Sequence, residues 1–271
     1  MTAGAAPRDK SDLPFYLSLG LFGGCYLILI AALIVVDVTH TSTADIGRAF
    51  ASAEIRSAVW LSLLSCSASA ILSVWVAVPL GYVLSRTQFR GRGFIDLLLD
   101  IPMVLPPLVV GLSLLILFQT APGIWFQEHA FPVTYAVAGV VLAQFAISAA
   151  YATRTMRVTF DQIDPRAEDL ARTLGCNRGQ AFWRITLPEA RRGVLTAFTL
   201  SWARALGEFG PILVFCGATR MRTEVLSTSV FLELSIGNLE AALAVSLLMI
   251  AVAVLVLVVT RAFGLRGSGM I

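Results

Sequence analysis

Charged residues are scarce in this sequence of 271 residues. They make up 14% of the chain, against roughly 25% in a typical soluble domain. Lysine is almost absent, because Lys10 is the only one. A phosphate-binding P-loop needs a lysine directly after a glycine, and Lys10 follows Asp9. The chain therefore has no ATP site of this kind.

Catalytic and metal-binding patterns are missing as well. The sequence contains neither G-x-S-x-G nor H-E-x-x-H, and its two histidines, His40 and His129, are isolated. The four cysteines have no paired spacing, so neither a disulfide framework nor a zinc site is predicted. We expect no cofactor, no metal and no nucleic-acid partner for this chain, and we find no constellation typical of an intramembrane enzyme.

Long apolar runs are what the sequence does have, and hydrophobic residues make up 57% of it. A bilayer core about 30 Å thick requires about 20 apolar helical residues. Six windows meet this requirement: Pro14 to Val36, Ser57 to Leu84, Phe94 to Phe118, Pro132 to Thr153, Gly193 to Phe215 and Leu239 to Thr260. We predict an all-α integral membrane protein with six transmembrane helices in contact with lipid, the first being a retained helix and not a cleaved signal.

The basic residues are distributed unevenly between the predicted loops. The tails and the loops 86–93 and 154–192 carry fifteen of them, and the intervening loops carry four. Because arginine and lysine near helix ends favour the cytoplasmic side, both termini are predicted to be cytoplasmic. The predicted organisation is a tail over residues 1–13, a transmembrane domain over 14–262 and a tail over 263–271, in the plasma (inner) membrane.

The longest loop has the pattern of two short amphipathic helices. Asp164 is a predicted N-cap before a proline at the first helical position, and Gly175 supplies the helix stop. Asn177 and Gln180 resemble a capping box that opens a second helix, which Leu187-Pro188 is predicted to end. Apolar residues share one face of each helix: Ala167, Leu170, Ala171 and Leu174, then Ala181, Phe182 and Ile185. Periodicity alone favours a membrane-surface role and a protein-docking role equally.

The spacing within this loop distinguishes the two roles. D-L-A-R-T-L-G begins at Asp169, and I-T-L-P begins at Ile185 after nine intervening residues. This resembles the EAA loop, E-A-A-x-x-x-G followed by I-x-L-P, of permease subunits of binding-protein-dependent ABC importers, with Asp169 and Leu170 in place of the glutamate and the first alanine. The resemblance implies that the loop, over about residues 157–192, docks into a groove on a separate ATPase subunit. The residues implied in this coupling are Asp164, Glu168, Asp169, Ala171, Leu174, Gly175, Phe182, Ile185, Leu187 and Pro188.

The fifth apolar window contains two charges, Arg204 and Glu208. Each charge at the bilayer centre costs about 2.5 to 3.5 kcal/mol on insertion scales, so such residues usually face a bundle interior or a water-filled cavity. Four residues apart, they are predicted to pair on one helix face. A structural ion pair is one interpretation, and a place in a transport pathway is the other. The glycines at 207 and 210 and the helix-breaking Pro211 favour the pathway.

The third window contains DIPMVLPPLVVGL, in which Pro106 and Pro107 are predicted to bend the helix. We expect the third and fifth windows to line and gate a translocation route, with Phe209 as a plug and Asp96 and Asp100 as further charges. The predicted gate residues are Asp100, Pro106, Pro107, Arg204, Gly207, Glu208, Phe209 and Gly210.

R-A-L-G-E-F-G, the upstream L-P-P and N-L-E-A-A-L-A-V-S from Asn238 to Ser246 are together similar to permeases of molybdate, tungstate and sulfate importers. The resemblance implies a MetI-like core, a homodimer with the pathway on its two-fold axis, and an oxyanion delivered by an external (periplasmic) binding protein. ATP and magnesium are then expected on the partner ATPase, and this chain is not an enzyme.

Two alternatives stay open at this point. One is an importer permease for another small solute, such as a polyamine, an amino acid or iron. The other is an ion-coupled secondary carrier that uses Arg204, Glu208, Asp96 and Asp100 as coupling charges, although the inverted repeats typical of such carriers are not found in the sequence.

Overall fold

The computed structural model describes residues 12–266, and this part of the chain is helical without strands. The first half contains α1 (Asp12–His40), α2 (Thr43–Ala51), α3 (Ala53–Arg86), α4 (Arg92–Val104), α5 (Pro107–Gln119), α6 (Ala121–His129) and α7 (Val137–Gln162). The second half contains α8 (Pro165–Thr173), α9 (Arg178–Ala181), the π-helical turn η1 (Phe182–Thr186), α10 (Leu187–Glu189), α11 (Arg191–Leu206), α12 (Gly210–Cys216), α13 (Leu226–Ser235) and α14 (Leu239–Arg266).

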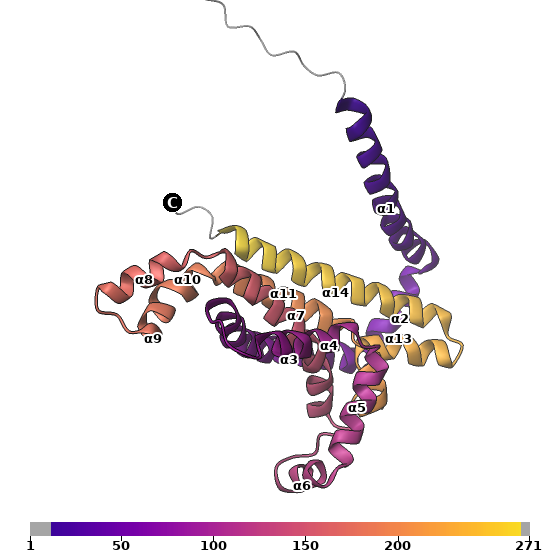
Figure 1. Cartoon of the computed structure of the whole chain (residues 1–271). Helices are drawn as coiled ribbons and strands as arrows, with labels where there is room; N and C mark the ends of the chain where they lie inside the picture. Colours follow the sequence, from indigo (N-terminus) through magenta and orange to yellow (C-terminus); the bar gives the residue numbers. More distant parts are fainter. Residues whose placement is uncertain (1–11, 267–271) are drawn as a thin grey trace, which may run out of the picture.

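The centre of the molecule is a bundle of α3, α7 and α11, with α14 alongside (Figure 1). Small residues bring these helices close together. The hydroxyl of Ser148 on α7 lies 3.2 Å from that of Ser69 and 2.9 Å from that of Ser73, both on α3. The hydroxyl of Ser201 on α11 donates to the carbonyl of Ser148 at 3.3 Å. In a membrane the hydrophobic effect does not drive helices together, because lipid is as apolar as the helix surfaces. Close packing and hydrogen bonds between small side chains hold the helices together instead.

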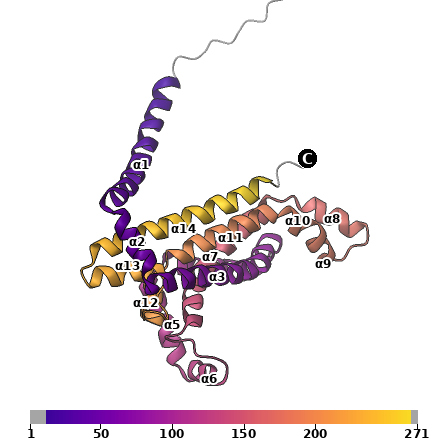
Figure 2. The same cartoon turned by 180° about the vertical axis from the view of Figure 1, so that it is seen from behind.

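The two ends of the bundle carry different elements. The segment from α8 to α10 lies at one end, beside the carboxyl end of α14, and α2 and α13 lie at the opposite end (Figures 1 and 2). We call these the loop end and the far end. The α5–α6 segment projects from the side of the bundle in both views.

By length and apolar composition, four helices of the described part could cross a membrane: α1, α3, α7 and α14. The pair α4 and α5 meets the same test but is bent by 111°. The bend predicted at the double proline is therefore present. Leu105 and Pro106 are extended, because a residue before proline is pushed out of the helical region.

The fifth predicted window is interrupted. Helix α11 ends at Leu206 and α12 begins at Gly210, so neither piece reaches spanning length alone. Pro211 lies in the first turn of α12, where its missing N–H leaves no helical hydrogen bond unmade.

Helix α1 stands away from the bundle (Figures 1 and 2), and its spanning segment is not buried by the rest of the chain. Its exposed side chains are mostly large and apolar, including Phe22, Leu27 and Ile28. A surface of this size and character needs lipid or another protein to cover it.

Candidate functional site

The loop between α7 and α11 has the caps that its sequence predicts. The Asp164 carboxylate accepts a hydrogen bond from the Arg166 backbone N–H at 3.0 Å. Gly175 has a φ of 95°, a left-handed conformation that glycine adopts at little cost. Asn177 and Gln180 form the reciprocal capping box. Local hydrogen bonds thus fix the corner between α8 and α9.

The predicted end of the second helix at Leu187-Pro188 is wrong. The chain passes from α9 through the π turn η1 into α10, and Pro188 lies inside α10. A proline ring clashes with the carbonyl four residues earlier in a regular helix, and a π turn shifts this carbonyl register. The helical path therefore continues to Glu189, and α11 begins at Arg191.

The apolar face predicted for α8 points partly outward. Leu170 is 64% exposed and Leu174 is 86% exposed, whereas Ala171 between them is buried. Asp169 is exposed and lies 3.5 Å from Arg172. Large apolar side chains held outward on a capped helix are suited to contact with another surface.

Other predicted coupling residues face their own chain. Ile185 and Leu187 on η1 and α10 are half-buried. The Phe182 ring packs edge-on against Tyr82 of α3, with the ring centroids 4.7 Å apart. Phe182 thus anchors the loop to the bundle.

Glu168 fixes the loop to α3 through a contact set that we call the Glu168 latch: Tyr82, Arg86, Glu168 and Thr186. The Tyr82 hydroxyl donates to Glu168 Oε1, and the Thr186 hydroxyl donates to Oε2 at 3.2 Å. Arg86 Nε lies 3.9 Å from the same carboxylate, and its Nη2 donates to the Ile163 carbonyl at 2.8 Å. The latch joins α3, α8 and η1, so a force on the loop reaches α3 directly.

At mid-bundle, Arg204 and Glu208 form the predicted ion pair, with Arg204 Nη1 2.6 Å from Glu208 Oε1. Glu208 is 1% exposed. The Arg204 guanidinium also lies 5.6 Å from the centroid of the Tyr151 ring on α7. Within the break between α11 and α12, the Glu208 carbonyl accepts a hydrogen bond from Ser227 on α13 at 2.7 Å.

The break between α11 and α12 meets the break between α4 and α5. A Cβ added to Gly111 of α5 would lie 2.6 Å from Pro211 Cα, and one added to Gly210 would lie 3.1 Å from the Leu108 backbone nitrogen. Helices α5 and α12 therefore approach at backbone contact distance. The Phe209 ring beside this contact packs on Phe231 of α13. The structure thus brings Pro107, Gly210 and Phe209 into one region.

The two aspartates of the third window lie elsewhere. Asp100 accepts from Arg154 Nη1 at 2.6 Å, and Asp96 accepts from Arg157. Both arginines belong to α7. These pairs connect α4 to the loop-end half of α7, and they do not place Asp100 beside Arg204 and Glu208.

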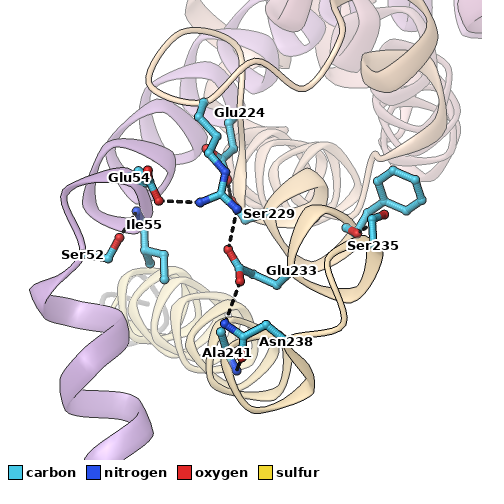
Figure 3. A network of polar contacts seen from close by, with 11 residues as sticks. Ser52, Glu54, Ile55, Glu224, Ser229, Glu233, Ser235, Asn238 and Ala241 are labelled. Atoms are coloured by element: carbon cyan, nitrogen blue, oxygen red, sulfur yellow. Dashed lines mark hydrogen bonds and ion pairs between the residues drawn. The ribbon is translucent and has the colours of Figure 1, made fainter.

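The far end carries an ion-pair cluster that no sequence pattern predicts (Figure 3). Arg220 donates to Glu54 of α3 and, at 2.9 Å, to Glu233 of α13. Glu233 also accepts from Asn238 at 3.1 Å. Glu224 nearby is buried and accepts from Ser229 at 2.8 Å, and burial raises the pKa of its carboxyl. The cluster ties the connection after α12 to α3 and α13.

One face of α7 and α11 is exposed and carries polar side chains among apolar ones. The exposed residues of this face include Arg154, Val158, Arg192, Thr196, Leu200 and Gly207. On α11, Arg192 and Thr196 are four residues apart and lie on one side of the helix. Arg204, twelve residues after Arg192, lies about a third of a turn further round the helix axis. On α7, Arg154 lies one helical turn after Tyr151, and the Arg204 guanidinium lies over the Tyr151 ring. Arginines therefore recur along this face from the break to the loop end.

A comparison with protein families matches residues 77–266 to the model described as "Binding-protein-dependent transport system inner membrane component". The sulfate transport system permease protein CysT of Escherichia coli is 31% identical over 258 residues, covering 93% of each chain. A probable molybdenum ABC transporter permease protein of Haloferax volcanii is 35% identical over 239 residues, covering 88% of this chain and 85% of that protein.

Among solved structures, a crystal structure of a bacterial alginate ABC transporter, in complex with an alginate pentasaccharide-bound periplasmic protein, matches with a TM-score of 0.77. The match covers 96% of this chain and 97% of that chain at 16% sequence identity. At this identity the likeness concerns the fold.

Proposed function

Because the chain belongs to the family of binding-protein-dependent transport system inner membrane components, we propose that it forms the translocation pathway for a tetrahedral oxyanion such as sulfate, molybdate or tungstate. The chain is an ABC importer permease, a multi-pass inner-membrane transport subunit and not itself an enzyme. The proposal concerns its substrate, its partners and the residues that act.

The arginine-bearing face of α7 and α11 carries the oxyanion assignment. Arg154, Arg192 and Arg204 follow this face, and the fork of a guanidinium matches the oxygens of an anion. Two of these guanidiniums have carboxylate partners, Asp100 for Arg154 and Glu208 for Arg204, and each has further N–H donors. Relatives named for sulfate and for molybdenum, each similar over most of its length, support the same substrate class.

We propose that two copies of this permease subunit form a homodimer. Arg204 lies inside the fifth apolar window with its side chain 31% exposed, and a charge at this depth is expensive to place against lipid. It becomes stable when two copies enclose it around a water-filled route on a two-fold axis. Helix α1, which its own chain leaves uncovered, then packs on lipid or on the second copy.

For the topology, we propose that α11 and α12 together form one broken span. With α1, α3, the bent α4–α5 pair, α7 and α14, this gives six spans and places both termini and the loop end in the cytoplasm. Irregular backbone at membrane depth is tolerated where it is buried in protein or lines a cavity, and the contact between the two breaks meets this condition. The proposed domain therefore covers residues 14–262 between short tails.

The loop around α8 is proposed to receive force from a separate ATPase subunit, which holds ATP and magnesium. Its exposed Leu170 and Leu174 supply apolar contact, and Asp169 supplies charge at the rim. An apolar helix face with charged neighbours is a common way to dock into a groove. Because the Glu168 latch joins the loop to α3, the loop can pass this force to the bundle without bending.

The gate is proposed at the contact of the two helix breaks. Arg204, Gly207, Glu208, Phe209 and Gly210 belong to one break, and Pro106 and Pro107 belong to the other. In this proposal Phe209 closes the route, and the Arg204–Glu208 ion pair lies beside it. Asp100 contributes by holding α4 to α7 through Arg154.

The test is solute uptake by the complete transporter in vesicles, with its ATPase and its external binding protein present. Radiolabelled sulfate, molybdate and tungstate are compared with spermidine. We expect ATP-dependent uptake of at least one oxyanion and none of spermidine. Uptake of spermidine alone would refute the oxyanion assignment, and uptake without any ATPase subunit would favour the ion-coupled carrier.

A further inference from the structure

A cavity of about 650 Å³ opens on the polar face of α7 and α11 near the loop end. We call it the exit cavity. It is lined by Arg154, Thr155, Val158, Thr159, Gln162, Ile163, Glu189, Arg192, Gly193 and Thr196. Arg154 stands on α7 and Arg192 on α11, so both long helices contribute a guanidinium to one space.

The helices cross closely at this cavity. A Cβ added to Gly193 would lie 2.2 Å from the Thr159 side chain, so α11 passes directly over α7 here. This crossing fixes the positions from which Arg154 and Arg192 reach into the cavity. The cavity is therefore shaped by the backbone of two long helices, and its two arginines are held on separate walls.

The polar groups of the cavity are suited to an anion. Each guanidinium has five N–H donors in a planar fork. Arg154 gives one of its nitrogens to Asp100 at 2.6 Å, and it is 58% exposed. The Gln162 amide lies on the same wall. The threonine hydroxyls donate to carbonyls of their own helices: Thr155 to Tyr151, Thr159 to Thr155 and Thr196 to Arg192. Both guanidiniums also have partners within the chain, and together with Gln162 they carry the N–H donors that a ligand in the cavity would meet.

Two carboxylates limit the affinity. Glu189 lines the cavity, and Asp100 pairs with Arg154. A conduit needs sites that attract the solute but release it again. Two arginines whose positive charge is partly neutralised by carboxylates meet that need better than a site with positive charges alone.

The volume fits a hydrated oxyanion. A water molecule occupies about 30 Å³ of liquid, so the cavity corresponds to roughly twenty water volumes. Sulfate or molybdate can enter with much of its hydration shell. Desolvation, the main cost of binding a divalent anion, is then small.

We propose that the exit cavity is a transient binding site for the oxyanion between the helix break and the cytoplasm. Arg204 and Arg192 are twelve residues apart on α11, or about 18 Å at 1.5 Å per residue. An anion released at the break therefore meets Arg154 and Arg192 as its next positive groups. This inference rests on the proposed oxyanion function and adds a second site to it.

The experiment measures thiol accessibility in the complete transporter, reconstituted after the four native cysteines are replaced by serine. Thr196→Cys places a thiol in the exit cavity. Leu195→Cys is its control, because Leu195 lines a separate apolar groove between α3 and α11. Each is treated with an anionic and a cationic methanethiosulfonate reagent, with and without sulfate or molybdate.

We expect the anionic reagent to modify Thr196→Cys at least about threefold faster than the cationic one. The side chains that line the cavity have a net positive charge, from Arg154 and Arg192 against Glu189, and positive potential concentrates anions. Sulfate or molybdate slows this reaction, and Leu195→Cys has neither property. Adding Arg192→Gln removes both the preference and the protection, and Arg192→Lys restores the preference. Adding Arg191→Gln instead leaves both intact, because Arg191 makes the same change of charge one residue away but lines the apolar groove.

Uptake of the oxyanions is measured in the same vesicles. Normal uptake with no protection of Thr196→Cys overturns the exit cavity and leaves the proposed function standing. Equal effects of Arg191→Gln and Arg192→Gln would also overturn the exit cavity, because the change of net charge alone would then explain both. If the transporter with native cysteines takes up none of the three oxyanions, the proposed function fails and the role of the cavity fails with it. ATPase copurification with each variant confirms that the assembly is intact.

Discussion

Removal of one hydroxyl from the Glu168 latch should uncouple ATP hydrolysis from transport. Tyr82→Phe keeps the ring, which packs edge-on against Phe160 and Phe182, and deletes only the donor to Glu168. A hydrogen bond to a charged group contributes about 1.5 to 3 kcal/mol. Because Thr186 and Arg86 still hold the carboxylate, we expect Tyr82→Phe to cost about 1.5 kcal/mol, the lower end of this range.

A loss of about 1.5 kcal/mol raises the population of loops detached from α3 a little over tenfold. The loop then moves with the ATPase while α3 lags behind it. The assay is the ratio of oxyanion taken up to ATP hydrolysed in vesicles that contain the complete transporter. We expect this ratio to fall severalfold, with the ATPase subunit still copurifying, because Leu170 and Leu174 are untouched.

A double-mutant cycle with Glu168→Gln tests whether the two residues act through one bond. If they do, the coupling ratio of the double variant is little lower than that of the Glu168→Gln variant. Tyr26→Phe is the control, since Tyr26 is exposed on α1. A wild-type coupling ratio in both Tyr82→Phe and Glu168→Gln would refute the latch as a route for force.

Three further changes probe other parts of the molecule. Gly175→Glu forces a side chain into the left-handed region at a cost of about 1 to 2 kcal/mol; the protein should stay in the membrane but lose coupling, and normal uptake with normal ATPase copurification would contradict the docking role of the loop. Gly111→Ala places a methyl group 2.6 Å from Pro211 Cα and should lower the free energy of unfolding by about 1 to 3 kcal/mol by overpacking, whereas Gly93→Ala, a helical position with open space around it, should not lower the melting temperature. Burial raises the pKa of Glu224 above its usual 4.5, so the contribution of this group to stability is complete below pH 4.5 and is lost as the pH rises through the raised pKa. Glu224→Gln should therefore flatten the pH dependence of the melting temperature and raise that temperature at neutral pH. A parallel shift of the melting temperature at every pH would contradict this reasoning.

Short-range features of the site could be predicted from the sequence because neighbouring residues determine them. Asp164, Gly175 and Asn177 act within their own turns, through caps and a left-handed corner. Arg204 and Glu208 pair across the end of α11, because the turn that follows Leu206 keeps residues four positions apart close in space. In each case the stabilising partner lies within a few positions along the chain.

Partners distant in sequence could not be predicted in this way. Tyr82 and Glu168 are 86 positions apart, and Arg220 and Glu54 are 166 apart. Every charged residue has many possible partners at such separations, and only helix packing selects one. The same reason explains why Asp100 pairs with Arg154 and not with the charges of the fifth window.

Some of the packing did leave a signal in the sequence. Ser62, Ser69 and Ser73 follow one another at helical spacing, and all three are buried. Small polar residues at such intervals mark a close helix interface in a membrane. The π turn at η1, in contrast, has no comparable pattern, and Pro188 read alone indicates a helix end.

Helix α3 connects the two proposed centres of action. At its loop end it holds Glu168 through Tyr82 and Arg86. Toward its far end the Ser62 hydroxyl accepts from the Leu226 N–H of α13 at 2.8 Å. The next residue of α13, Ser227, donates to the Glu208 carbonyl in the break. A displacement of α3 along its axis therefore acts on both the loop and the break. Because α3 is one continuous helix of 34 residues, with Pro79 inside it, we expect the loop and the break to move together.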